Sequence, residues 1–384
     1  MIPYGRQDIT QADVDAVVAV LQSDFLTQGP AVPRFERMVA DHVGAGHAVA
    51  MNSATSALHL ACLALGLGPG DRLWTSPVTF VASANCALYC GATVDFVDID
   101  PATYNMSVAA LAEKLARAEA ADTLPSIVVP VHLCGQSCDM AAIASLARRY
   151  GFRVIEDASH AIGGRYRDAY VGDCRYSDIT IFSFHPVKIV TTAEGGMALT
   201  NDPALAERLA LLRSHGITRD PAHMEGGSDG DWYYQQVALG YNYRMTELQA
   251  ALGVSQMTRL DPYVARRHAI AERYDALLAD LPVVTPVRTA DAYSAFHLYV
   301  VRVAGSAPAR RLVFDRLRAD GIGVNVHYIP VHTQPFYRAL GFSTGDYPQA
   351  ERYYAEAISL PMYPTLTEQQ QDMVVAALQR ALTP

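Results

Sequence analysis

This 384-residue chain contains only two lysines, Lys114 and Lys188, and the other 28 of its 30 basic residues are arginines. A neutral lysine amine can form a Schiff base with a carbonyl group, whereas arginine stays protonated. Covalent amine chemistry therefore has two candidates. Lys188 follows the run 182–187 and precedes Gly195-Gly196, outside any amphipathic helical pattern. We interpret Lys188 as a candidate Schiff-base residue, with an ordinary loop lysine as the alternative.

Lys114 falls in a different pattern. The segment 107–119 carries an apolar stripe at helical spacing, and Glu113 and Arg117 stand four residues apart on its polar face. Lys114 lies between stripe and polar face, where the stem covers apolar surface and the amine reaches water. We therefore expect an ordinary solvated lysine here.

Other residues with suitable chemistry follow predicted strands. Asp157 ends the run 153–157, where a carboxylate could hold the pyridine nitrogen of pyridoxal phosphate protonated; a helix N-cap is the alternative. Small hydroxyl residues in 52–58 stand at the start of a predicted helix, where they and the free backbone amides could bind a phosphate group. The alternative is an ordinary helix cap that binds no ligand. Ser183 could add a hydroxyl to the same phosphate. Phe80 could stack on an aromatic ring, but taken alone it fits a core residue better.

The surrounding elements predict an α/β fold with a large, mostly parallel sheet, because short β-rich runs alternate with helix-length segments. Ligands in such sheets bind outside the carboxyl ends of the strands, where these polar residues stand. The expected strands are 47–51, 72–75, 93–97, 126–131, 153–156, 179–184 and 197–200, and the expected helices include 56–67, 107–119 and 140–150.

The pattern changes after residue 200. A long irregular loop is expected over 219–243, followed by two helices and then a smaller α/β unit. We expect two domains, 1–250 with an N-terminal arm and 251–384. In this half the expected helices are 246–260, 264–281, 307–320, 348–357 and 366–381, the last begun by a Thr365–Glu368 capping box; the expected strands are 297–303 and 324–328, and a helix begun by Thr10 belongs to the arm.

Composition narrows the class of protein. A hydrophobic fraction of 51% with 18% charged residues excludes wholesale disorder, and the net charge of −9 disfavours a nucleic-acid surface. Neither a signal peptide nor a stretch long enough to span a bilayer is apparent, so we expect a cytoplasmic protein that does not bind membranes. The six cysteines suit reduced thiols, and Cys134 and Cys138 lack the second pair that a zinc site needs, so no metal is expected.

Together these motifs resemble the DegT/DnrJ/EryC1/StrS family of pyridoxal-phosphate-dependent sugar aminotransferases across essentially the whole chain. The resemblance is most specific at 52–58, 156–161, 182–196 and 240–253. Within this family the chain is most similar to the branch that acts on UDP-linked 4-keto-6-deoxy-N-acetylhexosamines in pseudaminic acid biosynthesis. The segments that carry this narrower resemblance are 23–29, 52–58, 156–161, 183–188, 213–217 and 327–331.

The resemblance implies a fold-type-I homodimer with the active site at the subunit interface, and a ping-pong reaction with L-glutamate as amino donor. It makes Lys188 the Schiff-base lysine and general acid/base, and Asp157 the partner of the pyridine nitrogen. The remaining implied cofactor contacts are Ala54, Thr55, Phe80, His160, Ser183 and, toward the partner subunit's phosphate, Asn242; the implied sugar contacts are Tyr4, Gln28, His327 and Tyr328.

Several alternatives stay open. The substrate could be another nucleotide keto-sugar, such as a dTDP-sugar, and His327 could be a hydrogen-bonded histidine of the smaller unit. A non-enzymatic regulator of the same fold is disfavoured by the intact Lys188 and Asp157. A short-chain oxidoreductase is disfavoured because Asn52-Ser53-Ala54-Thr55-Ser56 stands where the Gly-x-Gly-x-x-Gly motif would be.

Overall fold

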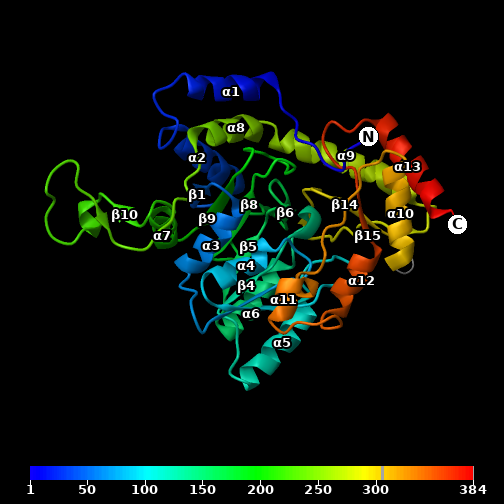
Figure 1. The fold of residues 1–384 in the computed structure, drawn as a ribbon, viewed down its shortest axis with the longest axis horizontal. Helices are drawn as coiled ribbons and strands as arrows, with labels where there is room; N and C mark the ends of the chain where they lie inside the picture. The colour runs from blue at the N-terminus through cyan, green and yellow to red at the C-terminus, as the bar shows by residue number, and fades with distance from the viewer. Residues whose placement is uncertain (304–306, 384) are drawn as a thin grey trace.

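A seven-stranded sheet forms the centre of the protein in this computed structural model, which describes residues 1–303 and 307–383 (Figure 1). Its strand order is β1-β9-β8-β5-β4-β2-β3. β9 runs antiparallel to β1 and β8, and the other neighbouring strands pair in parallel, which confirms the expected sheet type. The strands are β1 (His47–Met51), β2 (Arg72–Thr75), β3 (Thr93–Phe96), β4 (Ile127–Val129), β5 (Arg153–Asp157), β8 (Ile179–Ser183) and β9 (Gly196–Thr200).

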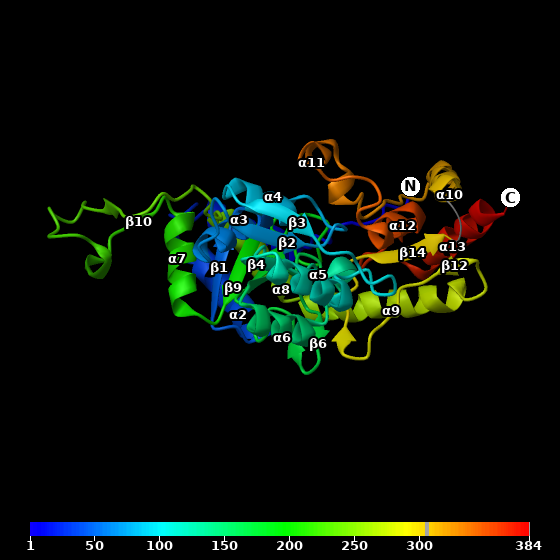
Figure 2. The same ribbon diagram turned by 90° about the horizontal axis from the view of Figure 1, so that it is seen from below.

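Helices cover both faces of this sheet (Figure 2). Every residue of the strands β8 and β9 is therefore buried, as is typical of a mostly parallel sheet. On β8, Ile181 packs in the apolar cluster that includes α3 and α4, while its neighbour Phe182 packs in the cluster that includes α2. The helices around the sheet are α2 (Ala31–Val43), α3 (Ala54–Ala64), α4 (Ala82–Tyr89), α5 (Val108–Ala120), α6 (Met140–Tyr150) and α7 (Pro203–Arg213).

A second, smaller sheet lies toward the C-terminus and has the antiparallel order β12-β14-β15. The N-terminal residue Ile2 packs in the same unit, bridging Ile322. The expected boundary at 250/251 falls inside α8, which packs on α1 and α2. The other α-helices and the strands of this sheet are α1 (Gln11–Leu21), α8 (Glu247–Met257), α9 (Leu260–Leu278), β12 (Val283–Val284), β14 (Tyr299–Val303), α10 (Ala307–Ala319), α11 (Pro335–Ala339), α12 (Pro348–Glu356), β15 (Ala357–Leu360) and α13 (Glu368–Leu382). The short strands β6 (Arg165–Tyr166), β7 (Ala169–Tyr170) and β13 (Ala292–Tyr293) form a further sheet of order β13-β6-β7.

The strand expected at 324–328 was a wrong prediction. Asn325 makes an isolated bridge to Ser359, and the chain then leaves the sheet so that residues 325–328 line a cavity. The third strand of the small sheet is β15, which the sequence analysis assigned to the end of a helix and its following loop. A single bridging residue is therefore all that the run 324–328 contributes to the sheet.

The start of α13 also differs from the prediction. Thr365 lies in a turn closed by the bond from the Leu366 amide to the Tyr363 carbonyl, so it does not cap the helix. The capping box is formed two residues later by Thr367 and Gln370. The expected cap at Thr10 is confirmed, since Asp13 completes a capping box there.

The expected irregular loop projects from the body of the protein beyond α7, at the left of Figures 1 and 2. It contains the short pair β10 (Ile217–Thr218) and β11 (Gln235–Gln236). Trp232 and Leu239 are 74% and 78% exposed, which is unusual for large apolar side chains. Within the described ranges, every helix is too short or too polar to cross a bilayer.

Candidate active site

The largest concentration of predicted site residues surrounds one cavity of about 580 Å³ at the carboxyl ends of the parallel strands. A cavity of this size falls within the range of ligand pockets in proteins. The predicted residues that line it are Tyr4, Ala54, Thr55, Phe80, Asp157, His160, Ser183, Lys188, His327 and Tyr328. The fold therefore brings together ten side chains that are spread over more than 320 positions of the chain.

Lys188 reaches this cavity from the turn after β8. The Lys188 amide bonds to the His185 carbonyl at 2.9 Å, which closes the turn. Burial lowers the pKa of the Lys188 amine to about 8, because the charged form loses hydration, and the nearby Asp157 charge opposes this shift. A lysine amine with this proton affinity is suited to act as a nucleophile and as a base near neutral pH.

The start of α3 forms another wall of the cavity. Ser53 caps the helix by accepting a bond from the Ser56 amide at 3.1 Å, and the amides of Ala54 and Thr55 belong to the turn that lacks intrahelical acceptors. Such a helix start favours a phosphate group. A side chain at Gly196 would collide with the Ala54 backbone, so this glycine lets α3 approach β9 closely.

Asp157 lies at the end of β5 with its carboxylate bound at both oxygens. Oδ1 accepts the Ser159 amide at 3.1 Å, and Oδ2 accepts the Ser83 hydroxyl at 2.5 Å. Both side chains are buried. The sequence analysis missed Ser83; the available signal was a hydroxyl one helical turn beyond Thr79, beside the candidate Phe80.

His160 is held between two groups in one defined tautomer. Its Nδ1 accepts the Cys134 amide at 3.3 Å, so Nε2 carries the hydrogen and donates to the Tyr328 hydroxyl at 3.1 Å. Burial lowers the His160 pKa well below its usual range, and the Lys188 charge acts in the same direction. His297, which the sequence analysis also missed, packs with its ring centroid 4.4 Å from that of His160. Burial lowers the pKa of His297 well below its usual range as well, so both rings are neutral.

For Phe80 and His327 the sequence left two interpretations open, a structural residue or a contact in the site. Phe80 is 59% exposed at the rim of the cavity, so its interpretation as a core residue was wrong. His327 is both hydrogen-bonded and part of the wall, because its Nδ1 lies 2.7 Å from Ser359 Oγ while the ring lines the cavity. Burial lowers the pKa of His327 to about 3, and the Lys188 charge contributes, so this imidazole is neutral.

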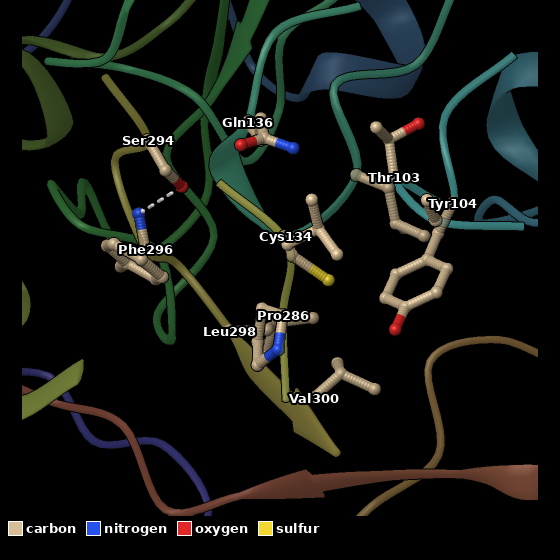
Figure 3. A pocket seen from close by; sticks show the side chains of 12 residues that line it. Thr103, Tyr104, Cys134, Gln136, Pro286, Ser294, Phe296, Leu298 and Val300 are labelled. Atoms are coloured by element: carbon tan, nitrogen blue, oxygen red, sulfur yellow. Dashed lines mark hydrogen bonds between the residues drawn. The ribbon is translucent and has the colours of Figure 1, made fainter. Parts of the chain in front are cut away.

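A second cavity, of about 20 Å³, is lined by Cys134, whose amide bonds to His160 Nδ1 (Figure 3). Cys134 points into it from its loop, and Leu298 and Val300 face it from β14 and its approach. Its lining contains no charged side chain. A space this small and uncharged separates the loop from the small sheet and offers no chemistry for a reaction.

Three predicted residues lie away from the main cavity. Lys114 donates to the Phe96 carbonyl at 2.5 Å and pairs with Asp95 at 2.6 Å, so the expected solvated amine was a wrong prediction. Gln28 and Asn242 are both exposed and do not line the cavity of their own chain. Asn242 stands near its rim, where its carbonyl accepts a bond from the Asn52 side chain at 3.4 Å.

The cavity fits pyridoxal phosphate, the cofactor that this set of residues suggests. A lysine amine of lowered pKa, a buried carboxylate and a helix start close to Ser183 are the three groups that would meet its aldehyde carbon, its ring nitrogen and its phosphate. The exposed Phe80 ring offers a surface for stacking on the cofactor ring.

Comparisons with known proteins identify the family of this chain. Residues 7–379 match the DegT/DnrJ/EryC1/StrS aminotransferase family. The chain is 41% identical over 383 residues to the spore coat polysaccharide biosynthesis protein SpsC of Bacillus subtilis, covering 98% of this chain and 96% of the relative. It is 38% identical to the GDP-perosamine synthase of Caulobacter vibrioides (96% and 95% covered). It is 36% identical to the UDP-4-amino-4,6-dideoxy-N-acetyl-beta-L-altrosamine transaminase of Campylobacter jejuni (94% and 93% covered).

Solved structures show the same fold. The putative sugar aminotransferase Spr1654 of Streptococcus pneumoniae in its PMP form superimposes with a TM-score of 0.91 at 30% identity, covering 100% of this chain and 99% of that one, and it is also known in a PLP form. Helicobacter pylori PseC, an aminotransferase of pseudaminic acid biosynthesis, gives a TM-score of 0.91 at 30% identity with 99% of both chains covered. The chain therefore belongs to the DegT/DnrJ/EryC1/StrS family of pyridoxal-phosphate-dependent sugar aminotransferases.

Proposed function

We propose that this aminotransferase moves an amino group from L-glutamate to the 4-keto carbon of a UDP-linked 4-keto-6-deoxy-N-acetylhexosamine, in pseudaminic acid biosynthesis. The observation that carries the amino-transfer chemistry is the Lys188 amine, whose pKa is about 8, in one cavity with Asp157 and the start of α3. The identity of 36% with the Campylobacter transaminase and the likeness to PseC support the choice of sugar.

The residues of the cavity have distinct roles in the proposed reaction. Bound pyridoxal phosphate supplies an electron sink for the carbon that loses or gains a proton. Lys188 would hold the cofactor through its Nζ, and the same amine would take the Cα proton of glutamate and, in the second half of the reaction, deliver a proton to C4 of the sugar. A base with a pKa near the working pH performs both transfers efficiently.

The remaining contacts orient the reactants. Asp157 binds the ring nitrogen and Phe80 stacks on the ring, while His160 lies beside the phenolic oxygen. Ala54, Thr55 and Ser183 bind the phosphate. Tyr4, Gln28, His327 and Tyr328 are proposed sugar contacts, and three of these four line the cavity of this chain.

We further propose a homodimer with shared active sites. Asn242 and Gln28 are exposed outside the cavity of their own chain, as expected of residues that act on a neighbouring subunit. Phe80 at the cavity rim and Trp232 on the projecting loop are exposed apolar residues of the kind that protein interfaces cover. All six cysteines are free thiols, a state typical of a reducing compartment, which supports a cytoplasmic location.

A second candidate function has its own support. The identities of 41% with SpsC and 38% with the GDP-perosamine synthase exceed that with the Campylobacter transaminase. An aminotransferase for another nucleotide keto-sugar is therefore the alternative, with the same residues acting on a different nucleotide or sugar configuration.

A substrate comparison separates the two functions. Purified enzyme with pyridoxal phosphate and glutamate is offered enzymatically prepared UDP-, GDP- and dTDP-linked 4-keto-6-deoxy sugars, and 2-oxoglutarate release is measured by a coupled assay. We expect the highest kcat/KM with the UDP-linked N-acetylated substrate of L configuration, and no turnover with Lys188→Ala. A higher kcat/KM with the GDP- or dTDP-linked sugar would reject the proposed substrate and favour the alternative.

A further inference from the structure

The Asp157 carboxylate is held in a fixed plane by donors on both of its oxygens. Oδ2 lies 2.5 Å from Ser83 Oγ, and Oδ1 lies 3.1 Å from the Ser159 amide nitrogen. The terminal torsion of an aspartate is otherwise broad, so a carboxylate with one donor can rotate. Each oxygen keeps a second acceptor position, which leaves the carboxylate free to receive one more N–H donor.

The Ser83 hydroxyl has a partner of its own. Thr79 Oγ1 lies 2.7 Å from Ser83 Oγ, and both hydroxyls are buried. Ser83 donates its single hydrogen to Asp157 Oδ2 at 2.5 Å, since the Phe80 carbonyl is much farther away at 3.4 Å, and the hydrogen of Thr79 therefore goes to Ser83. The bonds therefore run in one direction, from Thr79 through Ser83 to Asp157, and each polarises the next.

These hydroxyls also share a turn with Phe80. Thr79 precedes Phe80 in the chain, and Ser83 lies in the first turn of α4. One short segment thus presents an aromatic ring to the cavity and ties the carboxylate on β5. Its position couples the surface on which a flat cofactor ring would rest to the group that would bind the ring nitrogen.

We propose that Ser83, supported by Thr79, is a positioning residue that aims the Asp157 carboxylate at the ring nitrogen of pyridoxal phosphate. The inference rests on the role proposed for Asp157. Loss of the Ser83 hydroxyl frees one oxygen of the carboxylate, so the ring nitrogen is bound less firmly and is protonated a smaller fraction of the time. The ring then withdraws less electron density from the nitrogen of Lys188.

The test uses the bound cofactor and needs no sugar. Wild-type, Ser83→Ala, Ser83→Thr, Thr79→Val and Asp157→Asn proteins are reconstituted with pyridoxal phosphate, and two quantities are measured for each. These are the dissociation constant of the cofactor and the pH midpoint of its absorbance change. Ser76→Ala is the matched control, since Ser76 is equally buried but accepts a bond from the Val78 amide and lies outside the cavity.

We expect Ser83→Ala to weaken cofactor binding about tenfold, as for the loss of a bond to a charged group. The absorbance midpoint should move to higher pH, in the direction of the larger shift with Asp157→Asn. Thr79→Val should give a smaller shift of the same sign, and Ser83→Thr should restore the wild-type midpoint because it keeps the hydroxyl. A merely structural tie between α4 and β5 would change thermal stability without moving the midpoint.

The outcomes are separable. If Ser83→Ala matches Ser76→Ala in both affinity and midpoint while Asp157→Asn differs, the inference is overturned and the role of Asp157 stands. If Asp157→Asn also leaves the midpoint unchanged, the proposed role of Asp157 fails, and the inference fails with it. Should Ser83→Ala not fold, Thr79→Val decides, and a wild-type midpoint in that variant overturns the proposal.

Discussion

The Lys188 amine differs from an ordinary lysine amine in its proton affinity. An unperturbed lysine has a pKa of about 10.4, so only about 0.1% of its amines are neutral at pH 7.5. With burial lowering the pKa to about 8, roughly a quarter of the Lys188 amines are neutral at that pH. The cavity thus prepares the residue for attack on a carbonyl before any ligand arrives.

This environment predicts the pH dependence of cofactor capture. The rate constant for binding of pyridoxal phosphate to the cofactor-free enzyme should rise with pH with a midpoint near 8, because only the neutral amine attacks. Asp157→Asn should move the midpoint to lower pH, since the Asp157 charge raises the Lys188 pKa. Stopped-flow absorbance between pH 6 and about 10 measures this rate constant. Nα-acetyllysine amide, which has a free and unperturbed side-chain amine, is the reference and shows how titration of the cofactor itself affects the rate. A midpoint close to that reference would contradict the prediction.

At this scale the sequence was informative where a residue type is indispensable. Lys188 and Asp157 could be proposed because few residues can form a Schiff base or hold a pyridine nitrogen protonated, and the structure places both in one cavity. Ser83 and His297 were missed because serine and histidine are common and their parts depend on contacts across the fold. The 2.5 Å approach of Ser83 to Asp157 joins positions 74 residues apart, which no local pattern encodes.

Among the elements, β5 carries two carboxylates with opposite surroundings. Asp157 faces the cavity, whereas Glu156 is buried and bonds to His132 Nε2 at 2.7 Å and to the Ser177 hydroxyl at 2.5 Å. Burial alone would raise the Glu156 pKa, but bonds from His132, Ser177 and Thr180 outweigh it and lower the pKa. The network fixes the strand that presents Asp157.

Breaking this network should destabilise the enzyme in a pH-dependent manner. Glu156→Gln should lower the free energy of unfolding at pH 7 by roughly 3 kcal/mol, as for the loss of one partner of a buried charge pair. The folded-state pKa of Glu156 lies below its unfolded value of about 4.5, so the stabilisation is present above pH 4.5 and is lost as the pH falls through the folded value. Urea unfolding at pH 7 and pH 4 should therefore show a smaller difference from wild type in acid.

A matched control is available on α5. Glu113 pairs with Arg117 in solvent, and Glu113→Gln should change stability by less than about 0.5 kcal/mol at either pH. Equal urea midpoints for Glu156→Gln and Glu113→Gln at pH 7 would show that the buried network contributes no net stability.

The elements themselves were largely predictable because buried parallel strands are continuous apolar runs separated by helical periodicity. The errors arose where the local pattern was correct but the pairing was not local. The run 324–328 alternates apolar and polar residues as a strand does, yet only Asn325 meets a strand partner, Ser359, and the rest turns to the cavity. Likewise, Thr365 and Glu368 have capping-box spacing, but the turn at Tyr363–Leu366 delays the helix.

At the scale of the whole molecule, the site on a single chain is open on the side of Phe80, and Asn242 stands outside it. These are the features behind the proposed homodimer. The structure of one chain shows its sheet, its cavity and its exposed apolar residues. Which surface meets a neighbouring subunit is not encoded in a local sequence pattern, because the contact joins residues of two chains.

Mixing inactive variants tests whether sites are shared between subunits. Lys188→Ala and Asn242→Ala, co-refolded in equal amounts, should recover about a quarter of wild-type activity, because half of the random dimers are mixed and one site in each is intact. Lys188→Ala with Asp157→Asn is the control, since both side chains line one cavity of the same chain and no mixed dimer gains an intact site. Absence of recovery in the first mixture would assign Asn242 to its own subunit.

The two lysines have different surroundings, and this difference allows the fraction of chains that carry the cofactor to be counted. The Lys114 amine is engaged by the Asp95 carboxylate and the Phe96 carbonyl, whereas the Lys188 amine opens into the cavity. With Lys188 holding the cofactor as proposed, borohydride reduction should leave one cofactor on one lysine of each loaded chain. A protease that cuts after unmodified lysine would release three peptides from an empty chain and two from a loaded one, because only the bond after Lys114 would remain cleavable. Counting peptides would thus count occupied sites.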